Sequence, residues 1–343
     1  MAVSTCKGPR VGYLVGTDEA GYGPNLGPLV VSATVWQVPG DPCEADLYES
    51  LRDVVTATPA RRRAAAAKES DLDGVCFPLL LADSKVVYKP SGGLAGLEFG
   101  LLSALAWVGR RPRSWREVWA ALDADGFARV ESLPWHDGYD RPLGSDAATI
   151  DRQALAVRAG AEAAGVRLVA LRSRAVFPEL WNERLDEHPN KSTVLSLVTL
   201  ELLGDVLDAL GTLEAAPVLA ICDKHGGRDR YRPLLQHCLT DALVEVRCEG
   251  RDESHYGWGR GERRVDVAFR AKAERYLPAA LASMASKYLR ELAMDAFNDY
   301  WRRRVPGLAA TAGYPVDAAR FKADIASAQR ALGIDDRILW RDR

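Results

Sequence analysis

The sequence has few residues with sulfur or imidazole side chains: 6 Cys, 3 Met and 5 His among 343 residues. The cysteines are scattered and form no C-x-x-C pair, which argues against a disulfide framework and against a cysteine zinc site. No apolar run is long enough to span a bilayer, and the first ten residues lack the apolar core of an export signal. We therefore expect a cytoplasmic protein without membrane contact.

An excess of basic residues is also missing. Lys and Arg number 45 against 47 Asp and Glu, a formal net charge of −2. This balance argues against a protein that holds nucleic acid by bulk positive charge, although a local basic groove needs only a few Lys and Arg on one face. The length suits one large domain or two modest ones.

Predicted strands alternate with predicted helices. Period-two and β-branched patterns predict strands at 11–17, 29–36, 166–177, 217–222, 242–250 and 263–274. Helical periodicity and end signals predict helices at 96–109, 190–211, 278–304 and 316–333. This alternation predicts an α/β domain with a mixed sheet.

Acidic residues follow three of the predicted strands. Asp18 and Glu19 follow the first strand, Asp223 follows a later one, and Glu274 follows the core of another, residues 265–269. Acids at the ends of core strands can converge at one edge of a sheet, where ligands of α/β folds bind. Mg²⁺ and Mn²⁺ prefer such oxygen ligands, and two of them can support phosphodiester cleavage.

The acids also have ordinary structural interpretations. An acid after a strand is most often a turn or cap residue, which is an alternative for Asp223. Glu253 or Asp266 fits the place of Glu274 about as well by spacing. From the residues alone, a metal or phosphate site is therefore one interpretation of the pattern.

The stretch "GTDEAGYGPNLGP", residues 16–28, resembles the opening signature of the type 2 ribonucleases H, the ribonuclease HII family. Further segments resemble landmarks of that family in the same order: "LADSK" at 81–85, "NKSTVLSLVTLEL" at 190–202, "VLAICDK" at 218–224, "KAERYLPAALASMASKYLRE" at 272–291 and "AGYPVDAARF" at 312–321.

The resemblance implies a ribonuclease H-like mixed sheet flanked by helices, with a C-terminal helical part. Residues 1–305 would form the catalytic domain, with insertions near 97–165 and 226–264, and residues 306–343 a helical extension that contributes to substrate binding. The implied activity is that of an endonuclease, active as a monomer with two Mg²⁺ or Mn²⁺ ions. It would cleave the RNA strand of RNA–DNA hybrids or junction duplexes to 3′-hydroxyl and 5′-phosphate ends.

The resemblance assigns metal-binding catalytic roles to Asp18, Glu19 and Asp223, with Glu274 replacing a fourth Asp. It implies further that the loop around Tyr22 reads the 2′-hydroxyl, since its two flanking glycines admit a sugar to the backbone. Family members usually carry Arg or Lys where this chain has Tyr22, so strict recognition of a single embedded ribonucleotide is not implied. The substrate-binding residues expected on these grounds are Gly21, Tyr22, Gly23, Ser84, Lys85, Lys191, Lys224, His225, Arg228, Ser283, Lys287 and Tyr314.

Each of these substrate contacts has a plain alternative. The basic run after Asp223 is a solvated face as readily as a phosphate site. His225 would protonate a leaving oxygen or help release a metal, but a lone histidine seldom does so. Tyr314 would pack on a deoxyribose, or serve as a half-buried aromatic before Pro315.

Two other classes of function remain as alternatives. A phosphotransferase of the sugar-kinase and actin-like superfamily shares the core topology, but the sequence shows no clear second Gly-rich phosphate loop. A hybrid-binding protein without catalysis is the other, suggested by Tyr22 and Glu274.

Overall fold

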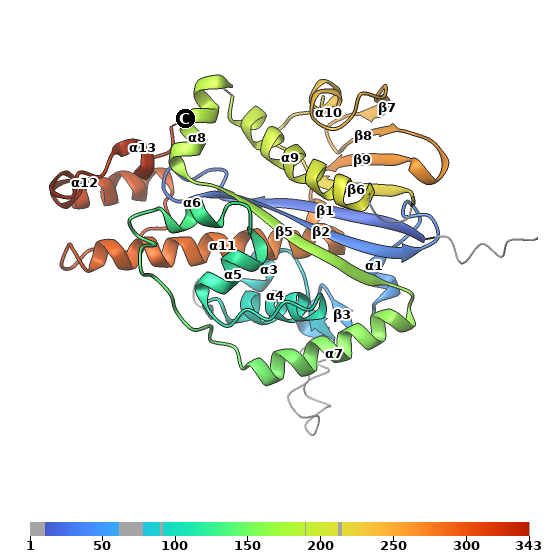
Figure 1. Ribbon diagram of the computed structural model, residues 1–343, viewed down its shortest axis with the longest axis horizontal. Coiled ribbons are helices and arrows are strands. Elements are labelled where there is room, and N and C mark those ends of the chain that lie inside the picture. Colours follow the sequence, from blue (N-terminus) through green and yellow to red (C-terminus); the bar gives the residue numbers. More distant parts are fainter. Residues whose placement is uncertain (1–10, 62–77, 90–91, 189, 212–214, 343) are drawn as a thin grey trace, which may run out of the picture.

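A seven-stranded mixed sheet forms the centre of the computed structural model, which describes residues 11–61, 78–89, 92–188, 190–211 and 215–342 (Figure 1). Its order is β5-β2-β1-β6-β9-β8-β7. The strands are β1 (Val11–Ala20), β2 (Leu29–Pro39), β5 (Arg167–Val176), β6 (Val218–Asp223), β7 (Glu245–Glu249), β8 (Glu253–Trp258) and β9 (Val265–Arg270). A separate parallel pair consists of β3 (Val55–Thr56) and β4 (Leu79–Leu80).

Strand direction changes at the centre of the sheet. β1 and β2 are antiparallel, as are β2 and β5, whereas β6 and β9 run parallel to β1 and to each other. β8 and β7 then extend the sheet by antiparallel pairing. Because β1 and β6 are parallel neighbours, their carboxyl ends meet at one edge of the sheet. The predicted α/β class, with a mixed sheet flanked by helices, is confirmed.

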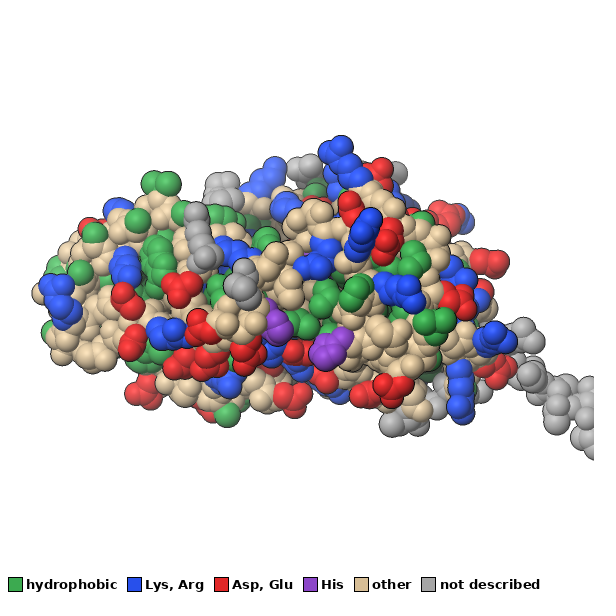
Figure 2. Space-filling view, turned by 90° about the horizontal axis from the view of Figure 1, so that it is seen from above, with side chains coloured by type: hydrophobic (Ala, Val, Ile, Leu, Met, Phe, Trp, Pro, Cys, Tyr) green, Lys and Arg blue, Asp and Glu red, His purple; other side chains and the backbone are tan. Residues whose placement is uncertain are grey.

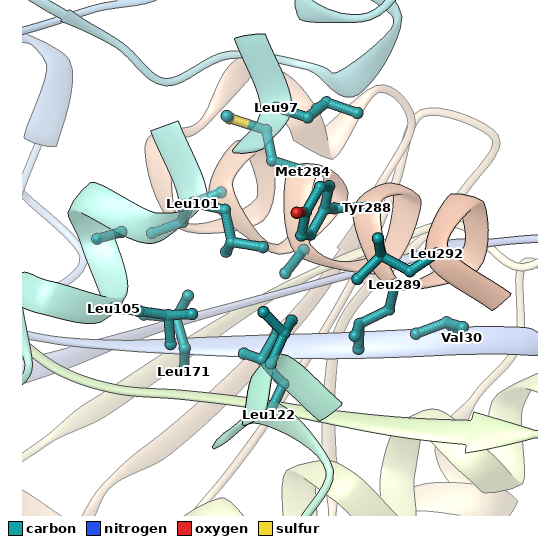
Figure 3. Close-up of a cluster of buried hydrophobic side chains, with 14 of the residues drawn as sticks. Val30, Leu97, Leu101, Leu105, Leu122, Leu171, Met284, Tyr288, Leu289 and Leu292 are labelled. Atoms are coloured by element: carbon teal, nitrogen blue, oxygen red, sulfur yellow. The ribbon is translucent and has the colours of Figure 1, made fainter. Parts of the chain in front are cut away.

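Helices from the two halves of the chain cover one face of the sheet (Figure 1). They are α4 (Ala95–Trp107), α5 (Trp115–Leu122), α7 (Ala147–Ala163) and α11 (Leu277–Arg302). Figure 3 shows how side chains of α4 and α11 meet over the strands, with Leu101 near Met284 and Tyr288 and with Leu105 beside Leu171 of β5. All five are at most 2% exposed, so α11 is held firmly on this face.

The opposite face carries α9 (Lys191–Gly211) and α10 (Arg232–Cys238). Apolar side chains of α9, such as Leu195 and Val198, pack there against the alternate residues of the strands, such as Val15 and Val31. The remaining helices are α1 (Leu47–Ser50), α3 (Ser84–Val87), α6 (Phe127–Glu131), α8 (Pro178–Glu187), η2 (Gly261–Arg263), η3 (Ala273–Arg275), α12 (Pro315–Ala331) and α13 (Asp336–Leu339).

The C-terminal part folds back onto the loop between β1 and β2 (Figure 1). Leu26 and Trp340 form a β-bridge, and the side-chain amide of Asn25 donates a 2.9 Å hydrogen bond to the carbonyl of Arg341. Phe321 of α12 lies 5.4 Å from Phe297 of α11, ring centre to ring centre, within the main core. Residues 306–342 therefore share one core with the sheet.

The structure extends two of the predicted strands. β1 ends at Ala20 rather than at 17, and β6 includes Asp223, so the acids belong to the strands themselves. Residues 97–165, expected as an insertion, supply α5, α7 and most of α4 to the core. Residues 226–264 supply α10, β7 and β8. Within the described part of the chain, no helix has the length and apolarity needed to cross a bilayer.

Candidate metal and substrate site

Three carboxylates meet at the shared end of the two central strands. Asp18 and Glu19 come from β1 and Asp223 from β6, and one ligand oxygen of each lies within 4.8 Å of the others. All three side chains are partly buried. The parallel pairing of the strands, with Thr17 opposite Cys222, brings the acids level with one another. The three predicted acids are thus brought together as expected.

Gly16 sets the depth at which α11 packs against β1. Any Cβ atom at this position would overlap the backbone of Pro278 and Ala279 in the first turn of α11. The hydroxyl of Thr34 on β2 donates a 2.8 Å hydrogen bond to the carbonyl of Pro278 and fixes the same turn. Since side chains alternate along a strand, Asp18 lies on the same face as Gly16 and faces α11.

Serines of α11 hold Asp18 in place. The Ser283 hydroxyl is hydrogen-bonded to the Asp18 carboxylate and lies 3.0 Å from the hydroxyl of Ser84. Ser286, one turn later, donates a 2.9 Å hydrogen bond to the Asp18 carbonyl and contacts Ser32 of β2. Ser84 and Ser283 are at most 8% exposed. Of the two predicted serines, Ser283 therefore contacts the Asp18 carboxylate, and Ser84 is hydrogen-bonded to Ser283.

Glu274 lies on the short turn η3, next to the three acids. The N–H of Ala273 donates a 3.1 Å hydrogen bond to Asp223, and the charge of Glu274 raises the pKa of both Asp18 and Asp223. The two other candidates for a fourth acid are paired elsewhere: Asp266 with His255 and Arg264, and Glu253 with Arg270. Glu274 is the candidate whose charge acts on the cluster, although it is not one of the three acids whose oxygens lie within 4.8 Å of one another.

Burial and like charge make the cluster resist ionisation. Burial, followed by the charges of Asp223 and Glu274, raises the pKa of Asp18 to about 8 against the opposing hydrogen bond from Ser283. Burial and the charge of Asp18 raise the pKa of Glu19 well above its ordinary value. The pKa of Asp223 is also raised, first by burial. Carboxylates that repel one another in this way are stabilised when a cation binds between them.

The donor set fits a hard divalent cation. Asp18, Glu19 and Asp223 offer oxygen atoms alone, the ligands preferred by Mg²⁺ and Mn²⁺. Lys85 at the start of α3 is exposed. Partial burial lowers its pKa, but the charges of Asp83 and Glu274 outweigh this, so the pKa of Lys85 is raised overall. Lys85 therefore lies at the rim of the cluster, within reach of a bound anion.

The loop after β1 lies beside the acids. Gly21 has a positive φ of 90°, and Gly23 is exposed, with the Tyr314 ring 3.8 Å from where its Cβ would be. The Tyr22 hydroxyl fits against Gly226, where a Cβ would lie 3.1 Å from it. Tyr314 is 58% exposed. The three predicted loop residues and Tyr314 therefore line one surface.

Other predicted basic residues are engaged within the protein. Lys224 pairs with Asp229 at 2.7 Å and also binds the carbonyl of Gly250, so it joins two loops. The Lys287 ammonium pairs with Glu291 and lies 4.7 Å from the ring centre of Tyr88.

Two further predicted cations lie at the start of α9. Arg228 donates hydrogen bonds of 3.2 and 2.7 Å to the hydroxyls of Ser192 and Thr193. Its charge also lowers the pKa of Tyr22, which burial raises overall. Lys191 is the first residue of α9 and is partly exposed. The start of α9 lies near this loop, since a Cβ at Gly226 would lie 3.1 Å from the Tyr22 hydroxyl and 3.7 Å from the Ser192 Cβ.

His225 is enclosed in the core. It is 1% exposed, its Nδ1 lies 2.9 Å from the Ser196 hydroxyl, and its ring meets those of Tyr231 and Phe269. Burial, with the charge of Arg228, lowers its pKa to about 3. The expected contact of His225 with substrate is therefore corrected, because the ring is a packing group with no open path to a ligand.

Three residues that support the site have no counterpart among the predicted ones: Ser286, Arg290 and Arg341. The Arg290 guanidinium binds the carbonyls of Pro28 and Ala312, each at 2.9 Å. Arg341 binds the loop carbonyls of Gly21 and Tyr22. Partners so distant in the chain leave no local pattern. For Ser286 alone the sequence held a signal, because it lies three residues after the predicted Ser283 and so shares a helix face with it.

Charge on the rest of the surface is mixed. On the face shown in Figure 2, Lys and Arg side chains are interspersed with Asp and Glu, in keeping with the net charge of −2. Attraction for a nucleic acid on this face would therefore depend on local groups.

No family model matches the sequence, and no curated protein matches it. Several solved structures resemble the chain. Ribonuclease H2 of Pyrococcus horikoshii OT3 has a TM-score of 0.42 and 14% identity, over 95% of this chain and 92% of the other. Ribonuclease HII of Archaeoglobus fulgidus, from a complex with PCNA, has a TM-score of 0.39 and 15% identity, over 96% and 94%. Bst-RNase HIII in complex with Mn²⁺ has a TM-score of 0.40 and 16% identity, over 96% and 66%.

Proposed function

We propose that this chain is a divalent-cation-dependent endonuclease that cleaves the RNA strand of RNA–DNA hybrids or junction duplexes. The observation that carries the proposal is the meeting of Asp18, Glu19 and Asp223 within 4.8 Å at the end of two parallel strands. The motif order along the sequence supports the substrate class, since the glycine-rich loop follows the first two acids directly.

In this proposal the four acids hold the cations. Asp18, Glu19 and Asp223 would supply most ligands, and Glu274 would complete the set from η3. When bound, one or two Mg²⁺ or Mn²⁺ ions would lower the pKa of a water molecule and stabilise charge on the phosphate. Ser283 orients the Asp18 carboxylate by its hydrogen bond, as residues behind metal ligands commonly do.

Groups around the acids would orient the nucleic acid. Lys85, on whose pKa the acids act, would contact the phosphate to be cleaved. The exposed ring of Tyr314 offers an apolar face for a sugar beyond the junction. The products would be 3′-hydroxyl and 5′-phosphate ends, as the family resemblance implies.

Replacement of Asp18 by Asn tests the proposal. The variant keeps the size of the side chain and removes its charge, so metal-dependent cleavage of a labelled RNA strand in a hybrid should fall below detection. Asp53→Asn, at an exposed position outside the cluster, is the matched control and should cleave like the unmodified protein. Cleavage by Asp18→Asn at an undiminished rate, with circular dichroism unchanged, would reject the assignment.

A further inference from the structure

A cavity lies at the outer edge of the sheet, beside the strand β5. β5 is an edge strand, and Figure 1 shows α5 and α6 alongside the end of β5 that leads into α8. The cavity between these elements has a volume of about 530 Å³, which is within the usual range for a small-molecule site. It is therefore large enough for a ligand of the size of a nucleotide.

Two side chains from outside the sheet close the edge of β5 at separate points. Asp123, which follows α5, accepts a 2.9 Å hydrogen bond from the N–H of Ala175. The Arg110 guanidinium lies 3.5 Å from the carbonyl oxygen of Leu171. Because every second residue of an antiparallel strand turns its main chain to the same side, Ser173 also turns its N–H and C=O outward. Ser173 lines the cavity, so its main-chain donor faces this space.

The arginines that line the cavity differ in their partners. Arg174 and Arg184 are both paired with Glu201 of α9. In the part of the chain that the structure describes, Arg129 and Arg172 form no ion pair. Arg172 is half-buried on β5, and Arg129 is exposed on α6. A half-buried cation without a counter-charge is costly, so an anion in the cavity would stabilise it.

The carboxylates around the cavity leave the charge of these two arginines in place. Asp205 is paired with Arg174 at 2.6 Å. Asp123 is 4% exposed and accepts a second main-chain hydrogen bond of 3.1 Å, from Gly126. Burial raises the pKa of Asp123, which disfavours its charged form. Asp125 is exposed, where solvent screens its charge.

The cavity also has an apolar wall, formed by Leu122, Leu180 and Leu202. We propose that this cavity binds a small organic phosphate, a nucleoside monophosphate or a molecule like it, through Arg129, Arg172 and the N–H of Ser173. A phosphate monoester has three acceptor oxygens and about two negative charges. Two guanidinium groups and a main-chain N–H match these oxygens and charges. The apolar wall takes the organic part of the ligand.

This site is separate from the carboxylate cluster. Asp18 lies opposite Ser32 in the pairing of β1 with β2, and Ser32 lies opposite Ser173 in the pairing of β2 with β5. Two strand spacings of about 4.8 Å place Ser173 about 10 Å from Asp18, with β2 between them. The site is therefore independent of the proposed function, and cations held by the acids take no part in it.

The direct test uses adenosine 5′-monophosphate in a phosphate-free buffer with a chelator, so that the acids hold no cation. Amide signals of the ¹⁵N-labelled protein are recorded as the nucleotide is added. We expect a saturable shift of the Ser173 amide. Adenosine, which lacks the phosphate, should cause no such shift.

Variants of the cavity arginines show which groups hold the phosphate. In Arg172→Gln the nucleotide concentration for half-saturation should rise about tenfold, as expected when one charge-assisted hydrogen bond is lost. Arg172→Lys keeps the charge without the planar fork and should fall between the two. Arg129→Gln, at an exposed position where folding is not at risk, should also weaken binding. Arg167→Gln, at an exposed position of the same strand outside the cavity, is the matched control and should respond like the unmodified protein.

Three results would overturn the inference. The first is a Ser173 amide that does not respond to the nucleotide in the unmodified protein, a result that needs no variant to fold. The second is an equal response to adenosine, or equal nucleotide affinities of Arg129→Gln, Arg172→Gln and Arg167→Gln. The third is a Ser173 amide that responds to a hybrid duplex but not to the nucleotide, which would assign the cavity to nucleic acid.

Discussion

The backbone N–H of Ala273 donates a 3.1 Å hydrogen bond to the carboxylate of Asp223. This bond ties the acid of β6 to the turn that carries Glu274. The residue before the turn, Lys272, has a φ of 59° and is the sole non-glycine residue with positive φ in the described chain. A left-handed residue at a turn is commonly held there by its surroundings, and here it precedes the turn from which the charge of Glu274 acts on Asp18 and Asp223.

Glu274 should contribute to cation binding. Glu274→Gln removes one charge from the ligand set, so the Mn²⁺ concentration for half-maximal cleavage should rise about 10- to 100-fold, the usual range for groups around a metal. Glu253→Gln is the matched control, because Glu253 is paired with Arg270 at 3.0 Å. Identical Mn²⁺ titrations of the two variants would contradict the role of Glu274.

The stability of the metal-free protein should fall as the pH rises. Burial and neighbouring charges raise the pKa of Asp18 to about 8 in the folded state, well above that of an unfolded Asp. Between pH 4 and 8 the folded chain therefore keeps a proton that the unfolded chain has lost, and stability declines with pH. Asp18→Asn has no such proton. In urea unfolding with chelator, its stability relative to the unmodified protein should increase from pH 5 to 8; a constant difference would contradict this.

Divalent cations should stabilise the folded chain through the same acids. Mg²⁺ or Mn²⁺ binds the folded state alone and should raise the melting temperature, since the ligands come together only on folding. The increase should be larger at pH 8 than at pH 6, because the cation then displaces fewer protons from Asp18. Chelator should reverse it. An equal increase in Asp18→Asn would show that the ions bind elsewhere.

Gly16 should not tolerate a side chain. Gly16→Ala would place a methyl group in the backbone of Pro278 and Ala279, and overpacking of this kind typically costs about 1–3 kcal/mol of stability. Since α11 carries Ser283 and Ser286, the cation affinity should fall as well. Gly211→Ala, at the end of α9 with open space around it, is the control and should be neutral in both urea unfolding and Mn²⁺ titration.

The sequence predicted the acids of the site better than the ion pairs around them. Acids at the ends of apolar strands are visible as local patterns, and parallel pairing of β1 and β6 makes Asp18 and Asp223 meet. The choice of Glu274 over Asp266 was beyond local reasoning. It depends on Asp266 being paired with Arg264, two residues before it, at 2.8 Å and with His255 of the neighbouring strand β8 at 3.1 Å.

Burial decided the cases in which sequence reasoning was wrong or silent. His225 follows Asp223 closely and looked chemically suited, but tertiary packing places its ring against Tyr231 and Phe269. No pattern in the sequence singled out Arg341. The fold buries its side chain, with the Arg341 guanidinium 4.1 Å from the centre of the Trp181 ring.

The bridge between Leu26 and Trp340 joins two segments that the ribosome makes far apart in time. During translation the loop at Gly21 must wait for more than three hundred further residues before Arg341 can close behind it. The nascent sheet can assemble sooner, since its strands end at residue 270. The hydrogen bonds of Arg341 to the loop beside the acids would thus form after the sheet, as a late step of folding.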